Sequence, residues 1–226
     1  MGQLESLDSD EGLDKRRHRH WYDRLMMLAD GVFAIAITLL AAEITPPTVT
    51  HGNLAQLWAA MQPQLDAYGL SVVVISVFWL AHRRFMAMIL TVDAPVSVLT
   101  LIMLGLVALI PAFTRLAETQ NGSPDAMLIY GALVVSIGFA VAAIWGYAAL
   151  IANLVSDEVP RRQRWFFFLL MLFTPPLFLI LTAVLGRPPP GAVPLTLIAL
   201  FLIGWRMRLW VIRRLGDAPT DGEAQL

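Results

Sequence analysis

The amino-acid sequence predicts an all-α membrane protein with six transmembrane helices per chain. The first observation is composition. The 226 residues are 58% hydrophobic and 15% charged, with a mean hydropathy of +0.67, whereas soluble domains are about half apolar and a quarter charged. The second is that apolar runs of membrane-spanning length alternate with short segments rich in proline, glycine or arginine. Cysteine is absent, which excludes disulfides, thiolate metal sites and cysteine catalysis.

The first apolar run extends from Leu25 to Ala42, and only Asp30, Gly31 and Thr38 within it are not plainly apolar. A helix of this length rises about 27 Å, close to the ~30 Å hydrocarbon thickness of a bilayer. The run is longer than the apolar core of a signal peptide. We therefore expect a retained transmembrane helix.

Polar segments frame a six-helix transmembrane domain expected over residues 21–216. We expect residues 1–20 to form a disordered cytoplasmic tail and residues 217–226 a short cytoplasmic tail. A surface helix is expected over 53–61, capped by Asn53, and Pro63 should open the second span. The five spans after the first are predicted at roughly 65–81, 96–113, 126–155, 165–185 and 193–212.

The distribution of basic residues predicts the orientation of these spans. Of the 16 Lys and Arg residues, 14 fall on one side of a six-span topology, and only Arg115 and Arg187 fall on the other. Because basic residues are retained on the cytoplasmic side, both termini are predicted to be cytoplasmic.

Asp30 is a carboxylate inside an apolar run, which is costly in a bilayer unless the group has a partner or water. Arg24 lies six positions earlier, about 240° around the helix, so it is not a helical neighbour. We expect a partner at the end of the second span, where the candidates are His82, Arg83 and Arg84. A structural pair between helices and a place in an ion pathway both fit this residue.

Five residues of the first run recur at helical spacing and share one face, namely Gly31, Ile35, Thr38, Leu39 and Ala42. By themselves these residues favour a packing seam between helices. If several copies surrounded an axis, the same face would line a pore with apolar constrictions at Ile35 and Leu39 and a ring of hydroxyl groups at Thr38. Glu43 is then either an ordinary interfacial charge or, at the outer end of this face, a residue that concentrates cations.

Motifs of other protein classes are missing from the sequence. There is no Walker loop, GxGxxG, HExxH, serine nucleophile elbow or TVGYG filter. The formal net charge of −1 gives no sign of a nucleic-acid partner. We therefore expect no enzymatic activity, no nucleic-acid binding and no cofactor.

Three segments resemble the transmembrane-protein-175 family of potassium channels. The first, Arg24-x-x-x-Leu28-Ala29-Asp30, is similar to the family signature RxxxFSD, with Leu-Ala in place of Phe-Ser. In the second span, Trp79-x-x-His82-x-x-Phe85 resembles WxxHHxxF, with Arg83 in place of the second histidine. The segment Leu109-Ile-Pro-Ala-Phe-Thr114 resembles the end of the family's third helix. The resemblance covers residues 20 to about 212 and fits a prokaryotic single-repeat member.

The resemblance implies a homotetramer in the plasma membrane of a prokaryote, with four first helices around a pore for monovalent cations. The family's hydrophobic constriction corresponds to Ile35, its wider apolar lining to Leu39 and Ala42, and its hydroxyl position to Thr38. The polar network behind the pore helix corresponds to Arg24, Asp30, Trp79, His82 and Arg83. Ala42 is small for this position, so the outer pore should be wider than in relatives.

The predicted function is a potassium-permeable, cation-selective channel with a hydrophobic constriction on its first helix and no carbonyl filter, whose only bound species are permeant K+ ions. The alternative is a proton-coupled secondary transporter that uses Asp30 and His82 as a relay. That transporter would show saturable flux lost on substitution of Asp30. A third possibility is a non-conducting membrane scaffold, which would show no flux.

Overall fold

The computed structural model describes residues 2–46 and 53–185, and this part of the chain is helical. Apart from one isolated bridge between Ile89 and Val155, it contains no β-structure. The sixth predicted span (193–212) and the C-terminal tail (217–226) lie outside the described residues. The elements are α1 (Gly2–Ala42), α2 (Leu54–Met86), α3 (Ala94–Ala108), α4 (Ile110–Thr119), α5 (Pro124–Gly146), the π-helix η1 (Tyr147–Ile151) and α6 (Arg161–Leu185).

Four helical stretches are long and apolar enough to cross a membrane. They are His20–Ala42, Leu54–Met86, Ala94–Thr119 and Pro124–Ile151. They correspond to the first four predicted spans. α6 covers the fifth predicted segment as a helix and contains Pro175 and Pro176. The all-helical membrane architecture is therefore confirmed for the described residues, with four candidate crossings.

Helix α1 begins much earlier than the sequence predicts. Its backbone is helical from Gly2 onward, where we expected a disordered tail over residues 1–20. No proline interrupts the chain before Pro46, and a helix that is already nucleated extends at little cost per residue. The polar segment before His20 therefore extends the transmembrane helix toward the N-terminus.

Helix α2 merges two elements that the sequence analysis separates. Asn53 caps it as expected, and its side chain accepts a hydrogen bond from the Gln56 N–H in a capping box. Pro63, however, lies inside the helix and does not open it. A proline removes one backbone hydrogen bond and can be tolerated when the flanking turns are held by other contacts. The expected surface helix is thus the first part of one continuous α2.

The predicted third span is broken into α3 and α4 at Leu109. Asp93 caps α3, and its side chain accepts a hydrogen bond from the Val96 N–H at 3.0 Å. Pro111 lies in the first turn of α4, where its missing N–H costs nothing. The chain turns after α4, where both Asn121 and Gly122 adopt positive φ.

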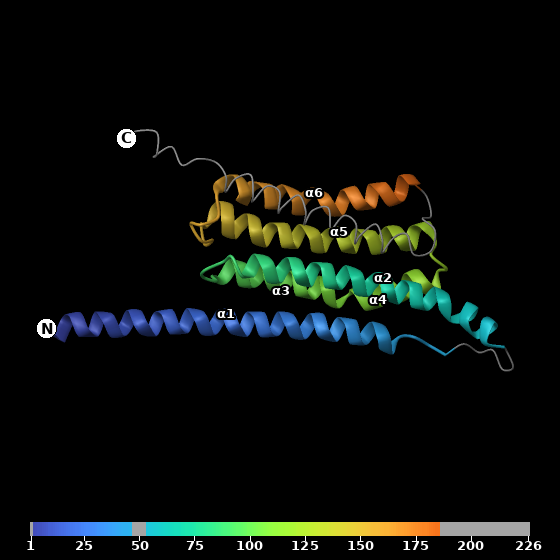
Figure 1. The fold of residues 1–226 in the computed structure, drawn as a ribbon, viewed down its shortest axis with the longest axis horizontal. Coiled ribbons are helices and arrows are strands. Elements are labelled where there is room, and N and C mark those ends of the chain that lie inside the picture. Colours follow the sequence, from blue (N-terminus) through green and yellow to red (C-terminus); the bar gives the residue numbers. More distant parts are fainter. Residues whose placement is uncertain (1, 47–52, 186–226) are drawn as a thin grey trace, which may run out of the picture. The chain divides into compact units, whose positions relative to one another are not determined.

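Figure 1 shows α5 between α6 on one side and the group of α2, α3 and α4 on the other. Three glycines of α5 allow α6 to pack closely against it. A Cβ atom at Gly131, Gly138 or Gly146 would clash with α6 at Leu179, Pro175 or Phe168, respectively. Small residues let two helix backbones approach closely inside a membrane, where packing replaces the hydrophobic effect as the source of attraction.

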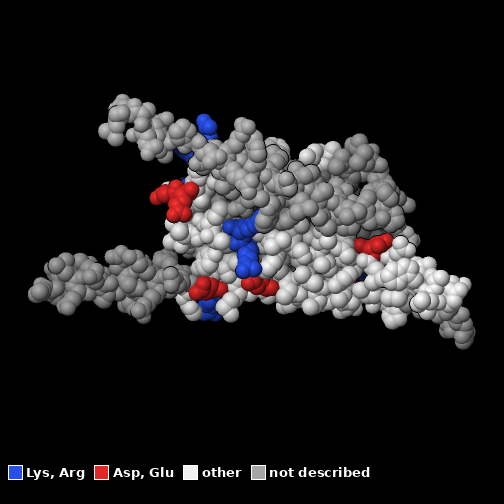
Figure 2. Space-filling model, in the orientation of Figure 1, with Lys and Arg blue, Asp and Glu red and all other residues white. Residues whose placement is uncertain are grey.

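The connections alternate between the two ends of the bundle. The α2–α3 and η1–α6 loops lie at the end where α1 enters, and the α4–α5 turn lies at the opposite end (Figure 1). Five of the described basic residues flank the first two loops, namely Arg83, Arg84, Arg161, Arg162 and Arg164. Figure 2 shows a stretch of uncharged surface between the charged side chains of the two ends. This arrangement suits a bundle that crosses a bilayer.

Candidate ion pathway along the first helix

The transmembrane part of α1 has one face that is packed within the chain. Ala29, Phe33, Ala36 and Leu40 are all buried, and Phe33 is only 1% exposed. They recur at spacings of four and three, which places them in one stripe of the helix. The stripe packs on α2, α3 and α4. Tertiary packing therefore fixes the rotation of α1 about its own axis.

The opposite face is the one predicted to line a pore, and no described residue covers it. Ile35 is 58% exposed and Leu39 is 48% exposed. Thr38 and Ala42 are also exposed. A Cβ atom at Gly31 would meet no other atom within 4 Å. The predicted stripe is therefore free to meet lipid, water or another copy of the chain.

The hydroxyl group of Thr38 is oriented by its own helix. Its Oγ1 donates a hydrogen bond to the Ile35 carbonyl at 2.9 Å. A hydroxyl oxygen keeps two lone pairs when its proton is donated in this way. The exposed Thr38 oxygen can therefore still accept a hydrogen bond from water or coordinate a cation.

Glu43 follows the last residue of α1, is half-buried and donates its backbone N–H to the Leu39 carbonyl at 3.1 Å. Two residues later, Thr45 exchanges two hydrogen bonds with the Gln64 side chain of α2, at 3.0 and 3.3 Å. These bonds tie the end of α1 to α2. Glu43 consequently lies beside a fixed junction between the C-terminal end of α1 and α2.

Asp30 accepts a hydrogen bond from the indole of Trp79, with Nε1 and Oδ1 separated by 2.7 Å. We expected a cationic partner for this carboxylate, and the structure provides a neutral donor. Arg83, one of the expected partners, lies over the Trp79 ring, with Cζ 5.4 Å from the ring centroid. The aromatic ring thus links the guanidinium to the carboxylate, because it attracts the cation with its face and binds the anion through its N–H.

His82 and Arg24 make no hydrogen bond to Asp30 among the residues that the structure describes, although His82 is close enough to interact electrostatically with the Asp30 carboxylate. The His82 side chain is buried, and its ring packs near Phe33 with the centroids 6.2 Å apart. Its Nε2 has no hydrogen-bond partner within the described part of the chain. Arg24 is exposed, and no ion pair or hydrogen bond joins its side chain to Asp30 among residues 2–46 and 53–185. Of the five predicted network residues, the structure brings Asp30, Trp79 and Arg83 together.

Sequence reasoning missed a second polar group, which is fully buried. Ser71 of α2 forms hydrogen bonds with Thr114 of α4 at 2.7 Å and with Tyr130 of α5 at 3.0 Å. Thr114 in turn donates to the Ile110 carbonyl at 2.8 Å. Hydroxyl residues are common in membrane helices and bond across them, so no pattern in the sequence distinguishes these three from others. They connect three helices behind the exposed face of α1.

Metal-binding chemistry has no visible basis in the described ranges. No group of three or more His, Asp or Glu side chains lies close enough together to hold a metal ion there. The site consists instead of an apolar face with one hydroxyl, flanked by a carboxylate at each end. Such a surface can carry a weakly held ion but offers no catalytic constellation.

Comparison with known proteins gives one consistent family. The model of the family described as endosomal/lysosomal potassium channel TMEM175 matches residues 24–111. A potassium channel of Streptomyces collinus is 33% identical over 141 residues, which cover 60% of this chain and 68% of that protein. A potassium channel of Chamaesiphon minutus is 28% identical over 167 residues, with 71% and 82% covered.

A protein of known structure and a human protein of the same family also match this chain. The crystal structure of a lysosomal potassium-selective channel TMEM175 homolog from Chamaesiphon minutus matches with a TM-score of 0.63 and 25% identity, covering 81% of this chain and 97% of that one. The human endosomal/lysosomal proton channel TMEM175 is 24% identical over 155 residues, which cover 68% of this chain and 30% of the human protein. Sequence and fold therefore agree, and this chain belongs to the TMEM175 family of membrane ion channels.

Proposed function

We propose that this protein is a potassium-permeable, cation-selective channel in which the exposed face of α1 lines the pore. The observation that carries the proposal is the division of α1 into a packed face and an uncovered one, with Ile35 at 58% exposure on the uncovered side. Lipid could cover its apolar side chains, but Asp30 is exposed at the edge of the same face. A carboxylate that faces hydrocarbon is costly, so water or protein is the better cover.

A single α1 cannot enclose a pore, so the proposal requires several copies of the chain. A homotetramer would bring four uncovered faces around one axis and leave the packed faces against α2, α3 and α4. The exposed arc of α1 is broad enough to supply both a pore lining and contacts between neighbouring copies. The relatives named as potassium channels support the conducting role that such a pore would have.

In this pore, Ile35 and Leu39 form the hydrophobic constriction. Apolar rings exclude water when narrow and conduct when wet, so they gate by dewetting. Ions that pass must lose part of their hydration shell, and the free lone pairs of Thr38 replace some of the lost oxygen contacts. Ala42 leaves the outer pore wide, and the Glu43 carboxylates raise the local concentration of cations.

The experiment is flux through the protein reconstituted in K+-loaded liposomes, with Na+ and Cs+ as comparison ions. We expect rapid, non-saturating flux that favours K+. The absence of flux for every ion would indicate a non-conducting scaffold. Slow flux that requires a proton gradient would indicate a transporter.

Substitution at the constriction tests the pore assignment itself. Ile35→Asn should wet the constriction and raise basal conductance about tenfold, which corresponds to a barrier lower by about 1.4 kcal/mol. The matched control is Ile102→Asn on α3, where the wild-type side chain is 53% exposed on a different helix. Unchanged current in Ile35→Asn, or an equal rise in both variants, would contradict the assignment.

The second candidate is proton movement through Asp30 and His82. Two observations favour it, namely the buried and unpaired His82 Nε2 in the described structure and the naming of the human relative as a proton channel. A relay requires the two groups to exchange a proton, whereas the hydrogen bond described for Asp30 comes from Trp79. Proton flux that Asp30→Asn abolishes, with K+ flux absent, would support this candidate over the channel for K+.

A further inference from the structure

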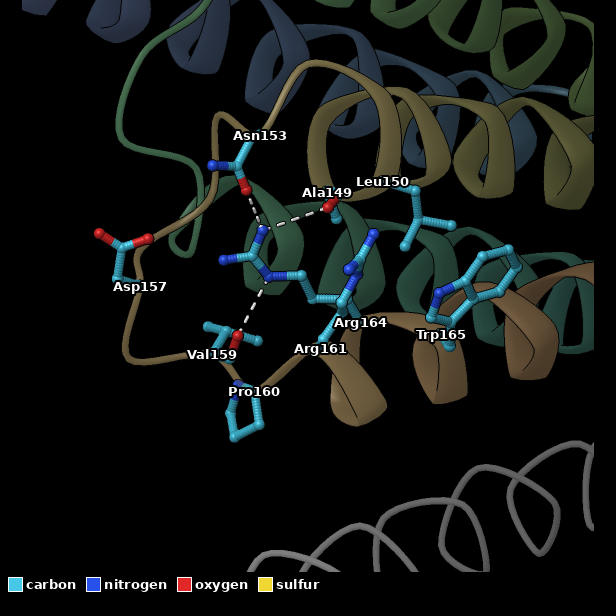
Figure 3. A pocket seen from close by; sticks show the side chains of 9 residues that line it. All are labelled: Ala149, Leu150, Asn153, Asp157, Val159, Pro160, Arg161, Arg164 and Trp165. Atoms are coloured by element: carbon cyan, nitrogen blue, oxygen red, sulfur yellow. Dashed lines mark hydrogen bonds between the residues drawn. The ribbon is translucent and has the colours of Figure 1, made fainter.

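A cavity of about 480 Å³ lies where η1 ends and α6 begins, at the same end of the bundle as the α2–α3 loop (Figures 1 and 3). This volume is within the range of ordinary ligand sites. Its lining comes from the last turn of η1, the connecting loop and the first turns of α6. The lining residues are Ala149, Leu150, Asn153, Asp157, Val159, Pro160, Arg161, Arg164 and Trp165. None of them belongs to the ion pathway described above.

Arg164 is the central residue of this cavity, and its side chain is only 8% exposed. All five N–H groups of its guanidinium donate to neutral oxygens. Nε donates to Val159 O at 3.0 Å, Nη1 to Ala149 O at 3.3 Å and to Asn153 Oδ1, and Nη2 to Val155 O at 3.5 Å and Ser156 O at 3.3 Å. No carboxylate pairs with Arg164 within the described ranges. Its positive charge is therefore solvated by dipoles but not neutralised.

A second guanidinium, that of Arg161, also lines the cavity. Asp157 is the only carboxylate among the described lining residues, so these groups carry a net charge of +1. In Figure 3, Asp157 lies on the opposite side of the Arg164 guanidinium from Arg161. Among the described residues, the part of the cavity near Arg161 is therefore positive and has no carboxylate beside it.

Trp165 indicates the depth of this cavity in the membrane. Its side chain is 49% exposed and follows directly on the charged first turn of α6. Tryptophan is enriched at the level of the lipid headgroups, where its ring meets hydrocarbon and its N–H meets water. A cavity beside such a residue suits the headgroup level, where the phosphate groups of lipids are concentrated.

We propose that this cavity binds a phosphate group, as presented by the headgroup of an anionic phospholipid or by free phosphate. The Arg161 guanidinium can donate to phosphate oxygens, whose planar spacing it matches, whereas Arg164, whose five N–H groups already donate within the chain, contributes only its positive charge. Basic pockets at the membrane surface bind anionic headgroups on the same principle. The site is remote from the proposed pore lining, and so the proposal stands whether or not Ile35 gates the channel.

The test is binding to the full chain in detergent micelles, with phosphatidylglycerol, phosphatidylcholine and inorganic phosphate as separate probes. Affinity is measured by lipid retention in native mass spectrometry and by the shift of the thermal unfolding midpoint. We expect phosphatidylglycerol to bind and phosphatidylcholine to bind much less. Binding of inorganic phosphate with the same affinity would assign the site to the free anion, and binding of neither anionic probe would overturn the proposal.

Adjacent residues provide matched variants of the same charge. Arg161→Gln should weaken binding of the anion about fivefold, the size expected for one basic residue at a membrane surface. Arg162→Gln should leave it nearly unchanged, because Arg162 is exposed and does not line the cavity. Arg164 is left intact because its hydrogen bonds hold the loop.

A variant that removes a negative charge from the cavity completes the test. Asp157→Asn should strengthen binding of the anion, and Glu158→Gln beside it should not, since only Asp157 lines the cavity. Equal effects in Arg161→Gln and Arg162→Gln, or in Asp157→Asn and Glu158→Gln, would show diffuse surface attraction and overturn the proposal. Thermal unfolding without a probe verifies that each variant is folded.

Discussion

The two faces of α1 are made of similar residues but have opposite surroundings. One face carries Ala29, Phe33, Ala36 and Leu40 and is buried within the chain, and the other carries Ile35, Leu39 and Ala42 and is exposed. Hydrophobicity therefore does not distinguish them. The difference is shape, since small alanines alternate with Phe33 on the packed face and allow α1 to approach the other helices closely.

This comparison separates what holds the chain together from what it presents to other molecules. Substitution on the packed face removes contacts inside the chain, whereas substitution on the exposed face leaves these contacts intact. The pore-lining residues of the proposed channel are thus free to vary without loss of the fold. Three substitutions test this division, in decreasing order of their expected effect on stability.

Phe33→Ala should lower the free energy of unfolding by about 3 kcal/mol, because it leaves a cavity beside His82 and removes buried contacts. The measurement is thermal or denaturant unfolding in one detergent. Ile35→Ala on the exposed face is the control and should change stability by less than about 0.5 kcal/mol. A comparable loss in both variants would show that the two faces are equally important for the fold.

Trp79→Phe tests the edge between the two faces, where Asp30 is held. The variant keeps an aromatic ring under Arg83 but removes the N–H that Asp30 accepts. We expect a loss of about 1.5 kcal/mol, at the low end for a hydrogen bond to a charged group because Asp30 is exposed. Asp30→Asn retains an acceptor and should lose less. If Trp79→Phe is as stable as the wild type, the hydrogen bond from Trp79 to Asp30 does not stabilise the fold.

Thr38→Val should have the smallest effect on stability, within about 0.5 kcal/mol, because the Thr38 hydroxyl bonds only to Ile35 O of its own helix among the described contacts. Its effect on function should be larger. The ratio of K+ to Na+ flux should fall, whereas Thr38→Ser keeps the oxygen and should retain the wild-type ratio. An unchanged ratio in Thr38→Val would show that this oxygen does not contribute to ion selection.

Several features were predictable because they depend on local physics. Apolar runs of bilayer length predicted the four candidate crossings, and the caps at Asn53 and Asp93 follow from side-chain oxygens placed before a helix. The stripe of Gly31, Ile35, Thr38, Leu39 and Ala42 followed from the period of the α-helix.

Other features depended on neighbours that local patterns do not encode. Pro63 was expected to begin a helix and lies inside α2, and the segment before His20 was expected to be disordered and continues α1. Asp30 was expected to pair with a cation and instead accepts the N–H of Trp79. In each case a contact or a continuing helix outweighed the local preference.

The sequence by itself determined that this is a helical membrane protein and which residues share each face of its first helix, because hydropathy and helical period are properties of the chain alone. Only the tertiary structure decided which of those faces is packed and which is free. It also decided that Arg164 has no carboxylate partner among the described residues where it lies beside a cavity. These outcomes depend on which helices meet, and that is settled by the fit of side chains from distant parts of the chain.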